Sequence, residues 1–213
     1  MTANDEEYGK SRQKSPFSDS GYYDPAPAQG TTVLSSPEDL DFGDEESTRW
    51  HGGLDFGLLI VRLALGGILG AHGLQKVFGT FNGPGAPEFA RILADHGFLT
   101  HPTILSWAGG IAEVAGSGLL ILGLFTPAAA AMLLSVTAIV VYLGYGNGFF
   151  LGTGDGFEYH LLLAATAFGL LFTGPGRLSL DVNTPWRRKP VPFAFLGVVL
   201  AGAAVAVVIT LFR

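Results

Sequence analysis

The sequence predicts an all-α, polytopic membrane protein, and three observations carry this prediction. Only 14% of the 213 residues are charged, against about 25% in an ordinary soluble domain. Five apolar runs approach the roughly 20 residues that a helix needs to cross about 30 Å of hydrocarbon. None of the runs alternates as a β-barrel strand would, so helices that satisfy their own backbone hydrogen bonds are expected.

The five predicted spans differ in the signals at their ends. The third opens with Thr126 as an N-cap and Pro127 at the first helical position. Its short connection to the second span predicts an antiparallel hairpin. The fourth is short for a span and stops at a Gly-Pro-Gly sequence, residues 174–176. The spans run from about Asp55 to Lys76, Thr103 to Leu122, Pro127 to Tyr145, Phe157 to Thr173 and Val191 to Phe212.

The connection between the first and second spans contains a short amphipathic segment, Pro87–Phe98. At helical spacing, Phe89, Ile92 and Leu93 share one face of this segment. We therefore expect it to form a helix that lies along the external membrane interface.

Charge and composition divide the chain into three segments. Residues 1–54 form an acidic tail with net charge −7, which leaves about +1 for the rest of the chain. The tail has no apolar periodicity and is predicted to be disordered and cytoplasmic. Residues 55–181 are expected to form a four-helix transmembrane domain, and residues 182–213 a basic linker with a fifth transmembrane helix. Because the acidic charge belongs to the tail, it gives no reason to expect a nucleic-acid partner.

Basic residues near the predicted spans are distributed unequally between the two sides of the membrane. The N-terminal side carries Lys10, Arg12, Lys14, Arg49, Arg177, Arg187, Arg188 and Lys189, whereas the other side carries Lys76, Arg91 and Arg213. The positive-inside rule therefore predicts a cytoplasmic N-terminus and an external C-terminus. The first span is expected to serve as its own uncleaved insertion signal. The chain has no cysteine, which excludes disulfides, thiol redox catalysis and thiolate metal sites within it.

One charged residue, Arg62, lies well inside the first span. Gly66, Leu69, Gly73 and Lys76 follow it at helical spacing, which predicts a groove of small residues that packs against another helix. Helical rise places Glu113 of the second span roughly 15 Å, and Arg62 roughly 20 Å, below the outer face. An ion pair between them would relieve the cost of burying each charge alone. Alternatively, Arg62 reaches the cytoplasmic headgroups and Glu113 is protonated.

A second polar group is predicted near the outer ends of the spans, formed by His72, Lys76, Trp107, Tyr142, Tyr145, Glu158 and His160. Donors and aromatic walls around a cavity at membrane level could bind and protonate the head group of a quinone. The same residues could instead form an interfacial belt, as aromatic residues commonly do. No paired-ligand spacing such as HxxxH or ExxH occurs, so no metal site is predicted.

These residues together resemble the DoxX family of bacterial membrane proteins over about Phe56–Asp181. The resemblance rests on Arg62–Gly79 (RLALGGILGAHGLQKVFG), Ala112–Ala130 with its glutamate, and a final core helix that opens with Glu158 and closes in TGPGRLSLD, Thr173–Asp181. The long acidic tail and the fifth helix depart from the four-helix family pattern.

The resemblance implies a four-helix core in the bacterial cytoplasmic membrane and a role in redox processes, including quinone reduction. It also implies that Arg62, His72, Lys76, Glu113 and Glu158 line a shared polar site. We therefore expect a quinone-binding membrane subunit of a redox complex, whose electron donor is a soluble protein partner. The alternative is a non-catalytic membrane scaffold or assembly factor whose acidic tail recruits a cytoplasmic partner. A small transporter is disfavoured because no inverted repeat is evident.

Overall fold

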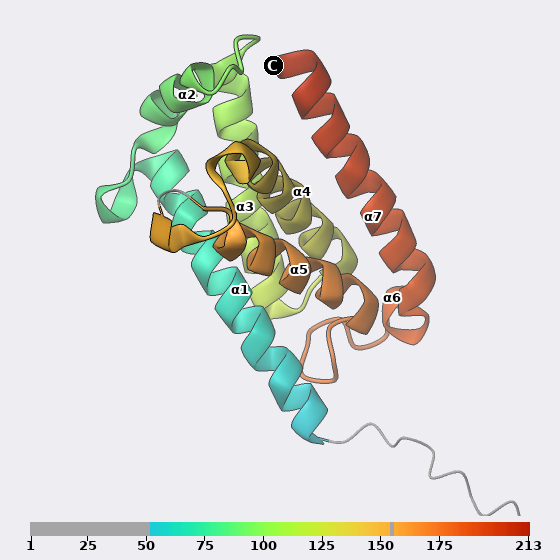
Figure 1. Cartoon of the computed structure of the whole chain (residues 1–213). Coiled ribbons are helices and arrows are strands. Elements are labelled where there is room, and N and C mark those ends of the chain that lie inside the picture. Colours follow the sequence, from blue (N-terminus) through green and yellow to red (C-terminus); the bar gives the residue numbers. More distant parts are fainter. Residues whose placement is uncertain (1–51, 154–155) are drawn as a thin grey trace, which may run out of the picture. The chain divides into compact units, whose positions relative to one another are not determined.

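The predicted all-helical class is confirmed by the computed structural model of the chain, which describes residues 52–153 and 156–213 (Figure 1). The predicted disorder of the tail falls on residues 1–51, outside the described part. The α-helices are α1 Gly52–Phe78, α2 Gly85–Asp95, α3 Pro102–Leu122, α4 Thr126–Gly144, α5 Glu158–Thr173, α6 Pro185–Arg188 and α7 Pro190–Val207. Short 3₁₀ turns occupy Thr80–Asn82, Tyr145–Asn147 and Leu151–Thr153, and a π-helical turn, Val208–Phe212, ends the chain. The described residues contain no strand.

Four helical segments are long and apolar enough to cross a membrane, and these are Gly52–Phe78, Pro102–Leu122, Thr126–Asn147 and Pro190–Phe212. The chain is thus a multi-pass membrane protein. The helix α5 is also apolar but has only 16 residues, which corresponds to about 24 Å of helix. It agrees with the short fourth span expected from the sequence. The helix α1 begins three residues before its predicted start, at Gly52.

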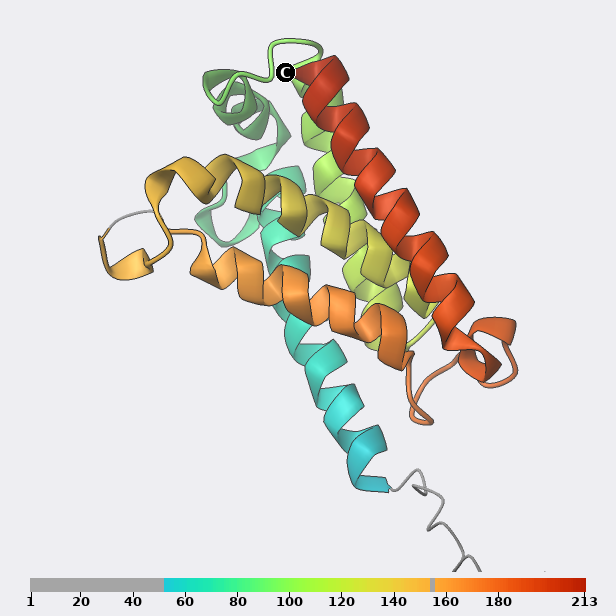
Figure 2. The same ribbon diagram turned by 45° about the vertical axis from the view of Figure 1, so that its right-hand side comes forward.

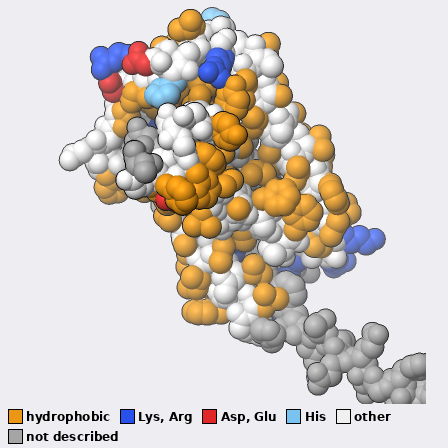
Figure 3. Space-filling model, in the orientation of Figure 1, with side chains coloured by type: hydrophobic (Ala, Val, Ile, Leu, Met, Phe, Trp, Pro, Cys, Tyr) orange, Lys and Arg blue, Asp and Glu red, His pale blue; other side chains and the backbone are white. Residues whose placement is uncertain are grey.

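The helices α1, α3, α4 and α5 form the core, and α7 packs on the outside of α4 and α5 (Figures 1 and 2). Leucines fill the centre of this core, whereas alanines let the helices approach one another. At the α7 contact, for example, Ala194 is fully buried, and a Cβ on Gly197 would lie 2.7 Å from Leu171. Hydrophobic side chains cover much of the outer surface (Figure 3), as lipid-facing helices require.

The helix α1 packs closely against α3 through the glycine stripe that the sequence predicts. A Cβ built on Gly66 would lie 2.7 Å from Ile121, and one on Gly73 would lie 2.9 Å from the backbone nitrogen of Val114. On the opposing helix, a Cβ on Gly110 would lie 2.5 Å from Val77. Small residues therefore determine both the distance and the register between α1 and α3.

The start of α4 differs from the sequence prediction. The side chain of Thr126 does not cap its own helix, and α4 begins at Thr126 itself. Instead, the carboxylate of Asp181, far along the chain, accepts hydrogen bonds of 3.1 Å from the backbone N–H groups of Phe125 and Thr126 and from the Thr126 hydroxyl. A carboxylate is a stronger acceptor than a hydroxyl for the N–H groups at a helix N-terminus, and Asp181 occupies the capping position.

Replacing Gly73 with alanine is predicted to destabilise the protein, because the added methyl group would overlap backbone atoms of α3. Overpacking of this kind typically costs about 1–3 kcal/mol. Thermal unfolding of the purified protein in detergent should therefore show a melting temperature several degrees lower. The matched control is Gly67→Ala on the same helix, where a Cβ meets nothing within 4 Å. Equal melting temperatures for the two variants would contradict the proposed close packing.

Candidate functional site

The helix bundle contains a partly open cavity of about 460 Å³ near the end that carries α2. We call this end the cavity end, and the opposite end, which carries α6, the basic end. Most of the cavity wall is apolar, and a minority of the lining residues are polar or charged. The lining residues are Leu69, His72, Lys76, Phe89, Ile92, Leu93, His96, Phe98, Leu105, Gly109, Glu113, Val136, Thr137, Ile139, Val140, Leu143, Gly144, Asn147, Phe157, His160, Leu163 and Val208.

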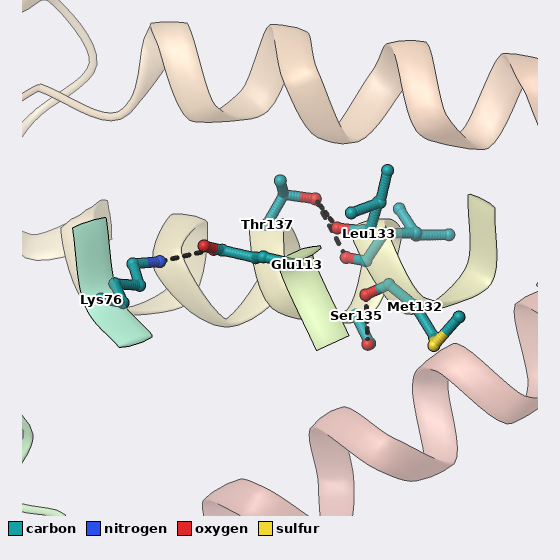
Figure 4. A network of polar contacts seen from close by, with 7 residues as sticks. Lys76, Glu113, Met132, Leu133, Ser135 and Thr137 are labelled. Carbon is teal, nitrogen blue, oxygen red and sulfur yellow. Dashed lines mark hydrogen bonds and ion pairs between the residues drawn. The ribbon is translucent and has the colours of Figure 1, made fainter. Parts of the chain in front are cut away.

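An ion pair between Lys76 of α1 and Glu113 of α3 forms the polar centre of the wall (Figure 4). The two side chains approach to 2.5 Å, and their exposed fractions are 19% and 2%, respectively. One carboxylate oxygen of Glu113, Oε2, is buried without a hydrogen-bond partner. The ammonium group of Lys76 also lies 5.1 Å from the centre of the Phe89 ring, where it gains a cation–π interaction. The nearby Thr137 hydroxyl donates a hydrogen bond to the backbone carbonyl of Leu133.

Three histidines from different parts of the chain contribute to the same wall. His72 lies one turn before Lys76 on α1, His160 lies in the first turn of α5, and His96 follows the end of α2. The His96 ring already forms a 2.8 Å hydrogen bond with the backbone carbonyl of Ile92. His72 and His160 therefore have the more available ring nitrogens, and both lie in the wall that contains Lys76.

The helix α2 covers the cavity with its apolar face. Phe89, Ile92 and Leu93, the three residues predicted to share a face, all line the cavity. A buried hydrogen bond of 2.7 Å from the Ser106 hydroxyl to the carbonyl of Ala86 attaches α2 to α3. The predicted helix is confirmed, and its apolar face packs over a protein cavity. Of these three side chains, Leu93 is buried, Phe89 is partly buried and Ile92 is exposed.

Four of the predicted site residues line the cavity, namely His72, Lys76, Glu113 and His160. The others lie outside its wall, and these are Arg62, Trp107, Tyr142, Tyr145 and Glu158. Glu158 accepts a hydrogen bond of 3.1 Å from the backbone of Leu151. The Tyr142 hydroxyl accepts one of 2.7 Å from the Arg213 guanidinium, which also lies 5.2 Å from the centre of the tyrosine ring. Trp107 is exposed on α3. None of these three side chains contributes to the cavity wall around the Lys76–Glu113 pair.

The expected pairing of Arg62 with Glu113 is wrong. That estimate assumed that α1 ends and α3 begins at the same depth. In the structure, Lys76 lies beside Gly110, so α3 extends eight residues, about 12 Å, beyond that point. The register places Glu113 beside Gly73. Arg62 precedes Gly73 by eleven residues, which separates it from Glu113 by about 16 Å along the helix axis.

Arg62 instead belongs to a structural network at the basic end. Its side chain is fully buried and donates a hydrogen bond to the carbonyl of Leu178. A Cβ on Gly123 would overlap its guanidinium, which places Arg62 at the turn between α3 and α4. The carboxylate of Asp181 interacts with it electrostatically. Arg62 therefore helps to hold the segment after α5 against the basic end of the helix bundle.

Two acidic residues that the sequence analysis did not select complete this network. Asp55 in the first turn of α1 is buried and accepts a hydrogen bond of 2.6 Å from the backbone N–H of Arg177. Asp181, besides capping α4, accepts one of 2.8 Å from the indole N–H of Trp186. The sequence signal was the TGPGRLSLD segment, which contains Asp181 and follows directly after an apolar helix. Its glycines and proline predict a turn, and the turn brings the carboxylate to the start of α4.

Among the residues that the structure describes, no three histidine or acidic side chains lie close enough together to hold a metal ion. The polar part of the cavity wall instead offers an ammonium group, imidazole rings and a carboxylate. These groups can donate hydrogen bonds and transfer protons.

Comparison with known proteins identifies one family. Residues 57–146, from α1 to the turn after α4, match the family model described as DoxX. No curated protein and no solved structure matches the chain. The matched segment contains Arg62, His72, Lys76 and Glu113.

A double-mutant cycle on the ion pair should reveal strong coupling. Removing one member of a buried ion pair leaves the other charge uncompensated, which typically costs about 3–5 kcal/mol. We therefore expect Lys76→Met and Glu113→Gln each to lower the melting temperature in detergent. The double variant should be more stable than the sum of the single effects predicts. Additive effects would show that the two side chains do not interact.

Proposed function

Because the chain is a multi-pass membrane protein that belongs to the DoxX family through residues 57–146, we propose that its cavity binds a quinone and that it acts as the membrane subunit of a redox complex. One observation carries the proposal. The Lys76–Glu113 pair, His72 and His160 lie together in the wall of an otherwise apolar cavity. A quinone has the matching chemistry, since its ring and tail favour apolar surroundings and its carbonyl oxygens accept hydrogen bonds.

The cavity offers donors for the quinone carbonyl oxygens. The ammonium group of Lys76 has three N–H donors, of which Glu113 accepts one. His72 and His160 are further donors in the same wall. The volume of about 460 Å³ lies within the range of about 300–1,000 Å³ that is typical of small-molecule sites. These features support binding of the head group within the bundle, with the apolar tail among the helices or in lipid.

The same residues could carry protons to the ligand. Reduction of a quinone to the quinol takes up two electrons and two protons. Histidine exchanges protons near neutral pH, and positioned carboxylate and ammonium groups can act as proton acceptors and donors. In this proposal, the histidines and the Lys76–Glu113 pair supply or receive the protons, and a soluble protein partner supplies the electrons.

We further propose that the protein lies in the bacterial cytoplasmic membrane with its N-terminus inside. Arg177, Arg187, Arg188 and Lys189 belong to the basic end, where α1 begins, and the cavity end carries Arg91 and Arg213. The positive-inside rule favours a cytoplasmic basic end. The cavity would then lie nearer to the external face.

Quinone binding can be tested with the purified full-length protein in lipid nanodiscs. We expect a short-chain ubiquinone or menaquinone analogue to bind in equilibrium titrations. Replacing His72, His160 or Lys76 should weaken binding at least tenfold, since each removes a hydrogen-bond donor from the cavity. Trp107→Phe, outside the cavity wall, is the control and should bind normally. Lack of binding by the unmodified protein would reject the quinone site and favour the scaffold alternative.

The orientation can be tested with single cysteines, because the chain contains none. Asn183→Cys at the basic end and Thr100→Cys at the cavity end both replace exposed residues outside the long helices. In intact cells, a membrane-impermeant maleimide should label position 100 and not position 183. After the membrane is permeabilised, both should react. The reverse pattern in intact cells would invert the proposed topology.

A further inference from the structure

A second pocket, of about 320 Å³, lies at the basic end and is lined by Asn183, Pro185, Arg188 and Lys189. Both cations are exposed. Within the described part of the chain, neither side chain forms a hydrogen bond or an ion pair. By contrast, the Arg187 guanidinium donates a hydrogen bond of 2.7 Å to the backbone carbonyl of Val182. The pocket therefore presents two positive charges that no group of the described fold neutralises.

The segment that carries these cations is held firmly in place. The indole N–H of Trp186 donates to Asp181 at 2.8 Å, and the ring stacks on Phe125 with 5.4 Å between centroids. The same ring contacts Phe193 of α7 edge-on. The backbone N–H of Lys189 donates to the carbonyl of Pro185 at 3.0 Å. The backbone that carries the two cations is thus fixed beside the start of α7.

An apolar surface begins where the pocket ends. Val191, Phe195 and Val199 follow at four-residue steps along α7, and each is at least half exposed. In Figure 3, blue basic side chains lie beside the hydrophobic surface at this end of the molecule. Positive charge and a continuous apolar face are thus adjacent, at the point where a membrane-spanning helix begins.

We propose that this pocket binds the head group of an anionic phospholipid, whose acyl chains lie along the exposed face of α7. The guanidinium of Arg188 can bind phosphate oxygens in a bidentate manner, and Lys189 adds a second positive charge. Basic residues next to membrane helices attract anionic lipids. The site is separate from the cavity and does not depend on the proposed quinone function.

The test measures lipid binding to the full-length protein in detergent by native mass spectrometry. Dioleoyl-phosphatidylglycerol and dioleoyl-phosphatidylcholine are titrated separately, because both carry a phosphate and differ in net charge. We expect phosphatidylglycerol to bind at least tenfold more tightly. The variant R188Q/K189Q should lose about fivefold in phosphatidylglycerol affinity for each charge removed, whereas its affinity for phosphatidylcholine should not change.

The control variant R91Q/R213Q removes two charges from the cavity end and should keep the phosphatidylglycerol affinity of the unmodified protein. Salt provides a test without mutation, since high ionic strength should weaken phosphatidylglycerol binding to the unmodified protein. Equal affinity for the two lipids would overturn the proposal. An equal loss of affinity in the two double variants would also overturn it, because it would show attraction by net charge rather than by this pocket.

Discussion

The close packing of α1 on α3 determines the position of the polar groups inside the bundle. Gly66, Gly73 and Gly110 allow the two backbones to approach, and their contacts leave one register. In this register, Lys76 reaches Glu113, and Arg62 reaches the turn after α3. A shift of one helical turn, about 5.4 Å, would separate the ion pair and leave charges unpaired in an apolar interior. Packing and electrostatics therefore select the same arrangement.

Buried charged groups lie both at the basic end and at the cavity end, and they are stabilised differently at the two ends. At the basic end, the Asp181 carboxylate accepts hydrogen bonds from the α4 backbone and from Thr126 and Trp186. These bonds use up the capacity of this carboxylate for further partners, and the network holds the fold together. Arg62 Nε and Nη1 are also buried there without a hydrogen-bond partner, but Arg62 does not line the cavity. At the cavity end, the Lys76–Glu113 pair borders an open space, and one glutamate oxygen has no partner. Spare hydrogen-bonding capacity beside empty volume is what a ligand site requires, so the cavity end is the better candidate for function.

The helices could be predicted from the sequence because lipid imposes a simple requirement on length and polarity. The partner of Arg62 could not be predicted, because it depends on how far α3 extends beyond α1. That offset follows from which residues of α3 the α1 glycines contact, and glycine spacing within α1 alone does not identify those residues. The cavity residues His96 and Asn147 were missed for a related reason. His96 directly follows α2, and Asn147 ends the 3₁₀ turn after α4. At such positions, apolar periodicity does not indicate where a side chain points.

The last long apolar helix, α7, is more than a peripheral addition. The match to the DoxX model ends at residue 146, but His160 of α5 and Val208 after α7 also line the cavity. The end of α7 is attached at this site, since the backbone N–H of Thr100 donates to the carbonyl of Phe212 at 3.1 Å and Arg213 binds Tyr142. Part of the cavity wall thus comes from segments beyond the matched region. Ligand selectivity in this chain would therefore depend on α5 and α7 as well as on the Lys76–Glu113 pair.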